Sequence, residues 1–259
     1  EIRLSLVGSE MCIRDSSCVI TNEEGWYKKA LDTDLARPKF AIMNPEITYT
    51  LPDYQTQCGC ADIMMHTMER YFVLEDTMEI TDKIAQDVMK NVMKYAKILK
   101  KDPENYEARA EIMWCGSLSH NGLTGCGTCG GDWATHLMEH ELGGMFDVAH
   151  GAGLAAVWGS WARYVMDEKP ERFAQFAVDV MGVEESDDVK STALKGIEAV
   201  EEFYRMIEMP TNMKELGINP TDEQIKDMAM KATNHDTQQL GAFKKLSAKD
   251  LVEIYKTAK

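Results

Sequence analysis

Residues 131–153 read GDWATHLMEHELGGMFDVAHGAG, and this stretch decides what kind of domain the chain forms. His136 and His140 stand four residues apart, a spacing that places two side chains on one helix face, one turn from each other. His150 follows ten residues later beside a Gly-Ala-Gly sequence, where backbone can approach another helix or a ligand closely. The stretch therefore predicts a helix with two histidines and a glycine-rich turn with a third.

A second pair lies upstream in Asp62-Ile-Met-Met-His66, where a carboxylate and an imidazole share one helix face. One aspartate with three neutral histidines suits a borderline divalent ion such as Fe²⁺ or Zn²⁺ and leaves room for a substrate oxygen. Either pair alone is more often a surface ion pair or a solvent-facing pair of histidines. The metalloprotease pattern H-E-x-x-H is absent, because Leu-Gly-Gly follows His140-Glu141.

Helical periodicity dominates the chain after Leu51-Pro52. One apolar face recurs at steps of three or four residues through Ile80, Ile84, Val88, Val92, Tyr95 and Leu99. Similar patterns predict helices over 104–118, 131–145, 153–166, 171–181, 188–207, 222–231 and 248–258. The last begins with Ser247-Ala-Lys-Asp250, a capping-box pattern.

The N-terminal part has a different texture. Ser17–Thr21 is a β-prone run that Asn22–Gly25 follows as a turn, and the apolar run Lys39–Met43 is typical of a buried strand. Residues 1–16 have no helical or strand period, and we expect them to be foreign to the fold. Since the first residue is Glu1, we also expect the chain to be incomplete. The predicted fold is thus an α/β remnant followed by an all-α domain.

Composition narrows the class of protein. The formal net charge of −15 argues against nucleic-acid binding, which needs a basic surface. No apolar run approaches the ~20 residues of a membrane-spanning helix, and no cationic stretch followed by an apolar core in these residues marks a secretory signal. The seven cysteines include Cys126-Gly-Thr-Cys129, but no second pair matches it, so reduced thiols in the cytoplasm are the expectation.

The histidine motifs resemble those of a known family. Gly131–Leu142 together with Asp147–Ala155 is similar to the signature of the iron-containing (group III) alcohol dehydrogenases, in the NAD(P)H-dependent butanol dehydrogenase branch. Asn44-Pro-Glu, Tyr49–Pro52 and Ala61-Asp62 resemble the other metal-binding stretch of the family, and His120-Asn-Gly-Leu123 also matches. The resemblance implies a dehydroquinate synthase-like architecture, with residues 17–50 as a remnant of the nucleotide-binding domain and 51–259 as the helical metal-binding domain.

The resemblance also implies roles for individual residues. It gives four metal ligands, which are Asp62, His66, His136 and His150. His140 corresponds to a histidine near the reacting centre that is not a ligand and that orients the nicotinamide or relays a proton. Lys28 corresponds to a lysine near the nicotinamide ribose, and Leu51 to a position beside the cofactor at the domain junction.

The implied reaction is hydride transfer between NADH or NADPH and a short-chain aldehyde or alcohol, such as butanal or butanol. A homodimer is left open. Because the glycine-rich pyrophosphate loop of the family is missing, these 259 residues alone are expected to be inactive. Two alternatives remain: a related enzyme of the glycerol dehydrogenase or dehydroquinate synthase kind, and a helical domain that binds a metal structurally or not at all.

Overall fold

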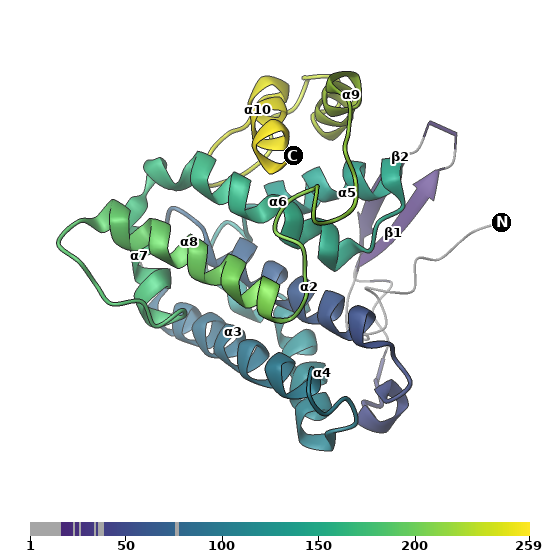
Figure 1. Cartoon of the computed structure of the whole chain (residues 1–259), viewed down its shortest axis with the longest axis vertical. Helices are drawn as coiled ribbons and strands as arrows, with labels where there is room; N and C mark the ends of the chain where they lie inside the picture. Colours follow the sequence, from purple (N-terminus) through teal and green to yellow (C-terminus); the bar gives the residue numbers. More distant parts are fainter. Residues whose placement is uncertain (1–16, 23, 26, 34, 36–38, 76–77) are drawn as a thin grey trace.

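Helices make up most of the described chain (Figure 1). The structure is a computed structural model, and it describes residues 17–22, 24–25, 27–33, 35, 39–75 and 78–259. The α-helices are α2 (Asp53–Tyr71), α3 (Glu79–Leu99), α4 (Tyr106–His120), α5 (Ala134–Phe146), α6 (His150–Val165), α7 (Pro170–Asp179), α8 (Val189–Met206), α9 (Asp222–Ala232) and α10 (Ala248–Ala258). Short 3-10 helices are η2 (Pro45–Thr48), η3 (Leu123–Gly125) and η4 (Met166–Glu168). The predicted all-α domain is confirmed.

The apolar period of α3 and the capping box of α10 form as the sequence predicts. Val88, Val92 and Leu99 are buried, whereas Ile80 in the first turn of α3 is exposed. The Ser247 side chain accepts from the backbone N–H of Asp250, whose carboxylate accepts from the Ser247 N–H in return. Local sequence therefore sets where these two helices lie and which face they bury.

Helices α2 and α6 form the centre of the domain. α2 packs against α3, α4 and α6, while α6 also packs against α5, α8 and α10. Both are buried almost all round, as helices with apolar or small residues on every face are. The candidate ligands on α2 therefore lie inside the protein and not on its surface.

The glycines after His150 are helical and do not form the predicted turn. A Cβ on Gly151 would lie 2.0 Å from the backbone oxygen of Cys58 in α2, so only glycine fits there. Glycine weakens a helix by about 1 kcal/mol relative to alanine, but at Gly151 the close approach of α2 and α6 outweighs this cost. The helix predicted from Gly153 consequently starts at His150, and the start of α6 is pressed against α2.

An antiparallel hairpin precedes the helices. Strand β1 (Ser17–Asn22) pairs with β2 (Tyr27–Asp32), and β2 packs beside α5 at the edge of the helical domain (Figure 1). The predicted strand and turn at the start of the hairpin are confirmed, while β2 was not foreseen.

The predicted buried strand over Lys39–Met43 is wrong. Residues 40–44 have no regular secondary structure, and the side chains of Phe40 and Ile42 are 79% and 77% exposed. The described strands β1 and β2 pair only with each other, so this run has no described strand edge to take its backbone hydrogen bonds. The expectation for residues 1–16 lies outside the described residues.

Among the described helices, none combines the length and the apolar character that crossing a bilayer requires.

Candidate metal centre

Three histidine nitrogens converge on one carboxylate oxygen. The Nε2 atoms of His66, His136 and His150 each lie 3.6 Å from Oδ1 of Asp62. These distances exceed those of hydrogen bonds, and Asp62 Oδ1 and His136 Nε2 are buried without a hydrogen-bond partner. Buried polar atoms without partners are costly, so two of them at the point where the Nε2 atoms of His66 and His150 also converge indicate a bound group.

The helix packing described above produces this convergence. Asp62 and His66 lie one turn apart on α2, His136 lies in the first turn of α5, and His150 is the first residue of α6. Gly151 holds the start of α6 against Cys58, one turn before Asp62. The His150 imidazole is thereby brought to the Asp62 carboxylate.

Glu69 joins the start of α5 to the end of α2. Its Oε1 accepts from the backbone N–H groups of Thr135 and His136, and its Oε2 contacts Nδ1 of His136. The carboxylate thus caps α5 and leaves Nε2 of His136 directed at Asp62. Burial by itself would lower the pKa of His136, but Glu69 raises it to about 10.

Glu139 contacts His150 as Glu69 contacts His136. Its Oε2 contacts Nδ1 of His150 and lies 3.6 Å from Nζ of Lys28 on β2. A Cβ on Gly143 would lie 2.9 Å from Lys28 Nζ and 2.7 Å from Glu139 Oε1, so this glycine makes room for the ion pair. Burial opposes ionisation of Glu139, but His150 and Lys28 lower the pKa of Glu139 to about 2.

His66 has a different neighbourhood, because it stacks on another imidazole. The ring centroids of His66 and His120 are 3.7 Å apart, and Nε2 of His120 lies 3.7 Å from Oδ2 of Asp62. Nδ1 of His66 lies 3.4 Å from the Arg70 guanidinium, a long contact to a group that only donates. Burial, with His120 and His136, lowers the pKa of His66 well below its ordinary value.

The Asp62 carboxylate is held ionised. Burial by itself would raise the pKa of this carboxyl, but His66 and the neighbouring imidazoles keep it well below its ordinary range. Asp62 is therefore an anion surrounded by imidazole nitrogens. A carboxylate with several imidazoles is a ligand set that binds a divalent cation well.

The donor set and its spacing fit such a cation. Ligand atoms about 2.0–2.2 Å from one Zn²⁺-sized ion in tetrahedral arrangement lie about 3.4 Å from one another. The spacing of 3.6 Å from Asp62 Oδ1 to each Nε2 is close to that value. Asp62, His136 and His150 can present ligand atoms that all lie within 4.8 Å of one another, as can Asp62, His66 and His120.

The predicted non-ligand histidine, His140, lies beside the proposed ligands. His140 lies one turn beyond His136 on α5, with ring centroids 6.5 Å apart, and its ring is 5.6 Å from that of His150. Burial, helped by His150, lowers the pKa of His140 to about 3, so this imidazole is neutral at physiological pH. It borders the centre, and Glu139, His140 and His150 can also present ligand atoms that all lie within 4.8 Å of one another.

The two residues predicted to bind the cofactor lie at different distances from this centre. Lys28 reaches it through Glu139, as described above. Leu51 lies half-buried in the bend between η2 and α2, where its N–H donates to Thr48 O. α2 begins two residues later at Asp53, and with a rise of about 1.5 Å per residue its first residue is roughly 14 Å from Asp62 along the helix axis.

Sequence reasoning missed three residues of this centre as contributors: Glu69, Glu139 and His120. Glu69 follows Asp62 by seven residues on the same helix face, which was an available signal. Nothing in the local sequence relates Glu139 to His150 or His120 to Asp62, because those contacts join different helices.

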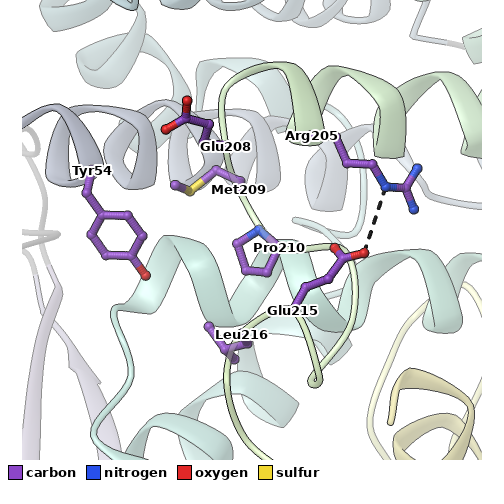
Figure 2. A pocket seen from close by; sticks show the side chains of 7 residues that line it. All are labelled: Tyr54, Arg205, Glu208, Met209, Pro210, Glu215 and Leu216. Carbon is purple, nitrogen blue, oxygen red and sulfur yellow. Dashed lines mark ion pairs between the residues drawn. The ribbon is translucent and has the colours of Figure 1, made fainter.

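Other features of the described chain do not join the centre. Cys126 and Cys129 are free and exposed, and His235 is exposed. A pocket lies between the start of α2 and the segment at and after the end of α8, and Figure 2 shows the ion pair of Arg205 with Glu215 at its wall. Its other charged side chain, Glu208, pairs with Lys100. The pocket is lined by Tyr54, Arg205, Glu208, Met209, Pro210, Glu215 and Leu216.

Sequence comparison identifies the family. The C-terminal domain of the Fe-containing alcohol dehydrogenase family matches residues 56–259, so the chain belongs to this family. NADH-dependent butanol dehydrogenase A of Clostridium acetobutylicum is 35% identical over 256 residues, which are 98% of this chain and 64% of that protein. NADPH-dependent aldehyde reductase YqhD of Escherichia coli is 30% identical over 259 residues, or 100% of this chain and 65% of that protein. The chain thus spans just under two thirds of the length of these relatives.

Solved structures of the same family have this fold. The crystal structure of Escherichia coli YqhD superposes with a TM-score of 0.89 at 29% identity, over 95% of this chain and 62% of that one. NADH-dependent butanol dehydrogenase A of Thermotoga maritima superposes with a TM-score of 0.87 at 33% identity, over 94% and 62%. The predicted family and helical architecture are confirmed.

Proposed function

We propose that the protein is a metal-dependent alcohol dehydrogenase or aldehyde reductase that uses NADH or NADPH on short-chain substrates such as butanal and butanol. The observation that carries the proposal is the convergence of three Nε2 atoms at 3.6 Å on Oδ1 of Asp62. The names of the relatives support the reaction, since they are butanol dehydrogenases and an aldehyde reductase. A cytoplasmic location stays a prediction from the sequence.

The proposed metal ligands are Asp62, His66, His136 and His150, for Fe²⁺ or Zn²⁺. When bound, the divalent ion supplies Lewis acidity at the substrate oxygen and the nicotinamide supplies the hydride. The chain itself contributes orientation: Glu69 and Glu139 each engage Nδ1, so that Nε2 of His136 and of His150 is free to ligate. The neutral His140 beside His150 would contact the substrate or nicotinamide and hold or pass a proton.

Lys28 and Leu51 remain proposed cofactor contacts. Lys28 supports the proposal most directly, because it lies in β2 with its ammonium against Glu139 and so near both His150 and His140. A nicotinamide ribose held there would lie beside the proposed ligands. Leu51 rests on the family resemblance alone.

The test compares metal content and turnover in site and control variants. In the full-length protein, Asp62→Asn and His150→Ala should lose bound metal and butanal reduction with either cofactor, while His235→Ala, which removes an exposed histidine, should retain both. Normal metal content and normal turnover in Asp62→Asn would sink the assignment. Because these 259 residues alone are expected to be inactive, the structural metal-binding alternative is favoured only if the full-length protein retains metal without turnover on aldehydes or alcohols.

A further inference from the structure

His120 carries a buried nitrogen that the proposed four-ligand site does not use. Its Nε2 has no hydrogen-bond partner, and its side chain is only 1% exposed. This atom lies 3.7 Å from Oδ2 of Asp62, on the carboxylate oxygen opposite the one that the other three histidines face. A buried, unpartnered nitrogen directed at a carboxylate needs a physical explanation.

The tautomer of His120 is set by its other nitrogen. Nδ1 lies 2.9 Å from the carbonyl oxygen of Gly116, which can only accept a hydrogen bond. Nδ1 also lies 2.7 Å from Oγ of Ser119, whose hydroxyl donates to the same carbonyl at 3.0 Å. The proton of the neutral imidazole is therefore on Nδ1, and Nε2 presents a lone pair to Asp62.

A lone pair facing a carboxylate oxygen is repulsive unless a cation lies between them. A proton on Nε2 would not resolve this, because 3.7 Å is too long for a hydrogen bond to Asp62 Oδ2. The stacked neighbour His66 is less well prepared to ligate than His120. Its Nδ1 faces the donor group of Arg70, and this weak contact competes with the tautomer that leaves Nε2 of His66 free to bind the cation.

We propose that His120 is a further nitrogen ligand of the divalent cation held by Asp62. This inference rests on the proposed metal site and extends it from three imidazoles to four. His120 approaches from the closed side, since its side chain is 1% exposed whereas those of His66 and His150 are 15% and 18% exposed. The open side of the centre stays free for a substrate oxygen.

The first experiment counts imidazoles in the unmodified protein. X-ray absorption spectra of the Zn²⁺-loaded protein should fit four imidazole nitrogens around the metal. A fit with three imidazoles would overturn the role of His120 while leaving the proposed metal site intact. If the unmodified protein binds neither Zn²⁺ nor Co²⁺, the proposed metal site fails and this inference fails with it.

The second experiment uses Co²⁺ as a spectroscopic probe. His120→Leu should bind Co²⁺ about 10- to 100-fold more weakly, at least the loss caused by removing an outer-shell partner, with a visible absorption spectrum altered by the lower coordination number. Ser117→Ala is the matched control, because it alters a buried side chain of the same helix that lies outside the cluster. If His120→Leu does not fold, His120→Gln replaces it in the same titration. Affinity and spectrum identical to those of the unmodified protein would show that His120 is a core residue.

Discussion

The four histidines around Asp62 form two pairs that are built differently. The carboxylate-backed pair, His136 and His150, stands at the starts of α5 and α6, and each Nδ1 contacts a buried glutamate. The stacked pair, His66 and His120, stands on α2 and at the end of α4, and its Nδ1 atoms face a guanidinium and a backbone carbonyl. A carboxylate behind an imidazole raises its basicity and fixes its tautomer more strongly than a neutral carbonyl does. We therefore expect the carboxylate-backed pair to dominate metal affinity.

The largest expected effect comes from Glu69, which supports one member of the carboxylate-backed pair. Glu69→Ala leaves two N–H groups of α5 and the His136 imidazole without their buried partner. We expect the free energy of unfolding to fall by about 3–5 kcal/mol, the usual cost of breaking a buried charged pair. Urea denaturation of the metal-free protein measures this loss.

Glu69→Gln is the informative companion, because its amide retains one acceptor and the size of the side chain. It should recover part of the stability lost in Glu69→Ala but little of the metal affinity. Equal metal affinity in Glu69→Gln and the unmodified protein would contradict the difference between the two pairs.

The next effect concerns the contact that brings the two pairs together. In Gly151→Ala the added Cβ meets the Cys58 backbone, so α6 must move from α2 and His150 from Asp62. We expect a loss of about 1–3 kcal/mol in the free energy of unfolding together with weaker metal binding. Gly196→Ala is the control, since its Cβ would lie 2.5 Å from the Cβ of Ala177 at the α7–α8 contact, away from the centre. This control should lose stability but keep its metal affinity, and the prediction fails if the two variants bind metal alike.

A smaller effect is expected from Lys28, which acts on His150 through Glu139. Lys28→Met removes the ammonium 3.6 Å from Glu139 Oε2 while retaining most of the volume of the side chain. Metal affinity should fall by less than the ~10- to 100-fold expected of Glu139→Gln, which removes the carboxylate that contacts His150 directly. Isothermal titration with Zn²⁺ ranks the metal affinities of the two variants. A larger loss of affinity in Lys28→Met than in Glu139→Gln would contradict the idea that Lys28 acts on His150 through Glu139.

The smallest effect is a pH dependence in the metal-free protein. The pKa of His136 is raised from 6.5 to about 10 by Glu69, so the protonated imidazole stabilises the folded state. This contribution is fully present below about pH 6.5 and is lost as pH rises toward about 10. The difference in Tm between the unmodified protein and Glu69→Gln should therefore shrink as pH rises through that window. A difference in Tm that stays constant from pH 6 to pH 10 would argue against the His136–Glu69 ion pair.

Much of the fold follows from local sequence. The helix carrying Asp62 and His66, the apolar face of α3 and the capping box at Ser247 depend on residues within a few turns of each other, and their prediction is confirmed. The strand prediction for Lys39–Met43 is wrong because an apolar stretch becomes a strand only beside another strand. The start of α6 was misplaced because the helix disfavour of glycine is outweighed at Gly151 by a close helix contact.

The sequence by itself determined the helical class, the family and the two i, i+4 pairs from which the metal site was predicted. These rest on short-range periodicity and on motifs that are read along the chain. Only the tertiary structure decided which imidazoles meet, which nitrogen each presents and which carboxylates stand behind them. Glu69 and His136 are 67 residues apart in sequence, so their contact exists only because the packing of α2, α5 and α6 closes that distance. The same packing placed His120 against Asp62, a contact that no spacing along the chain indicates.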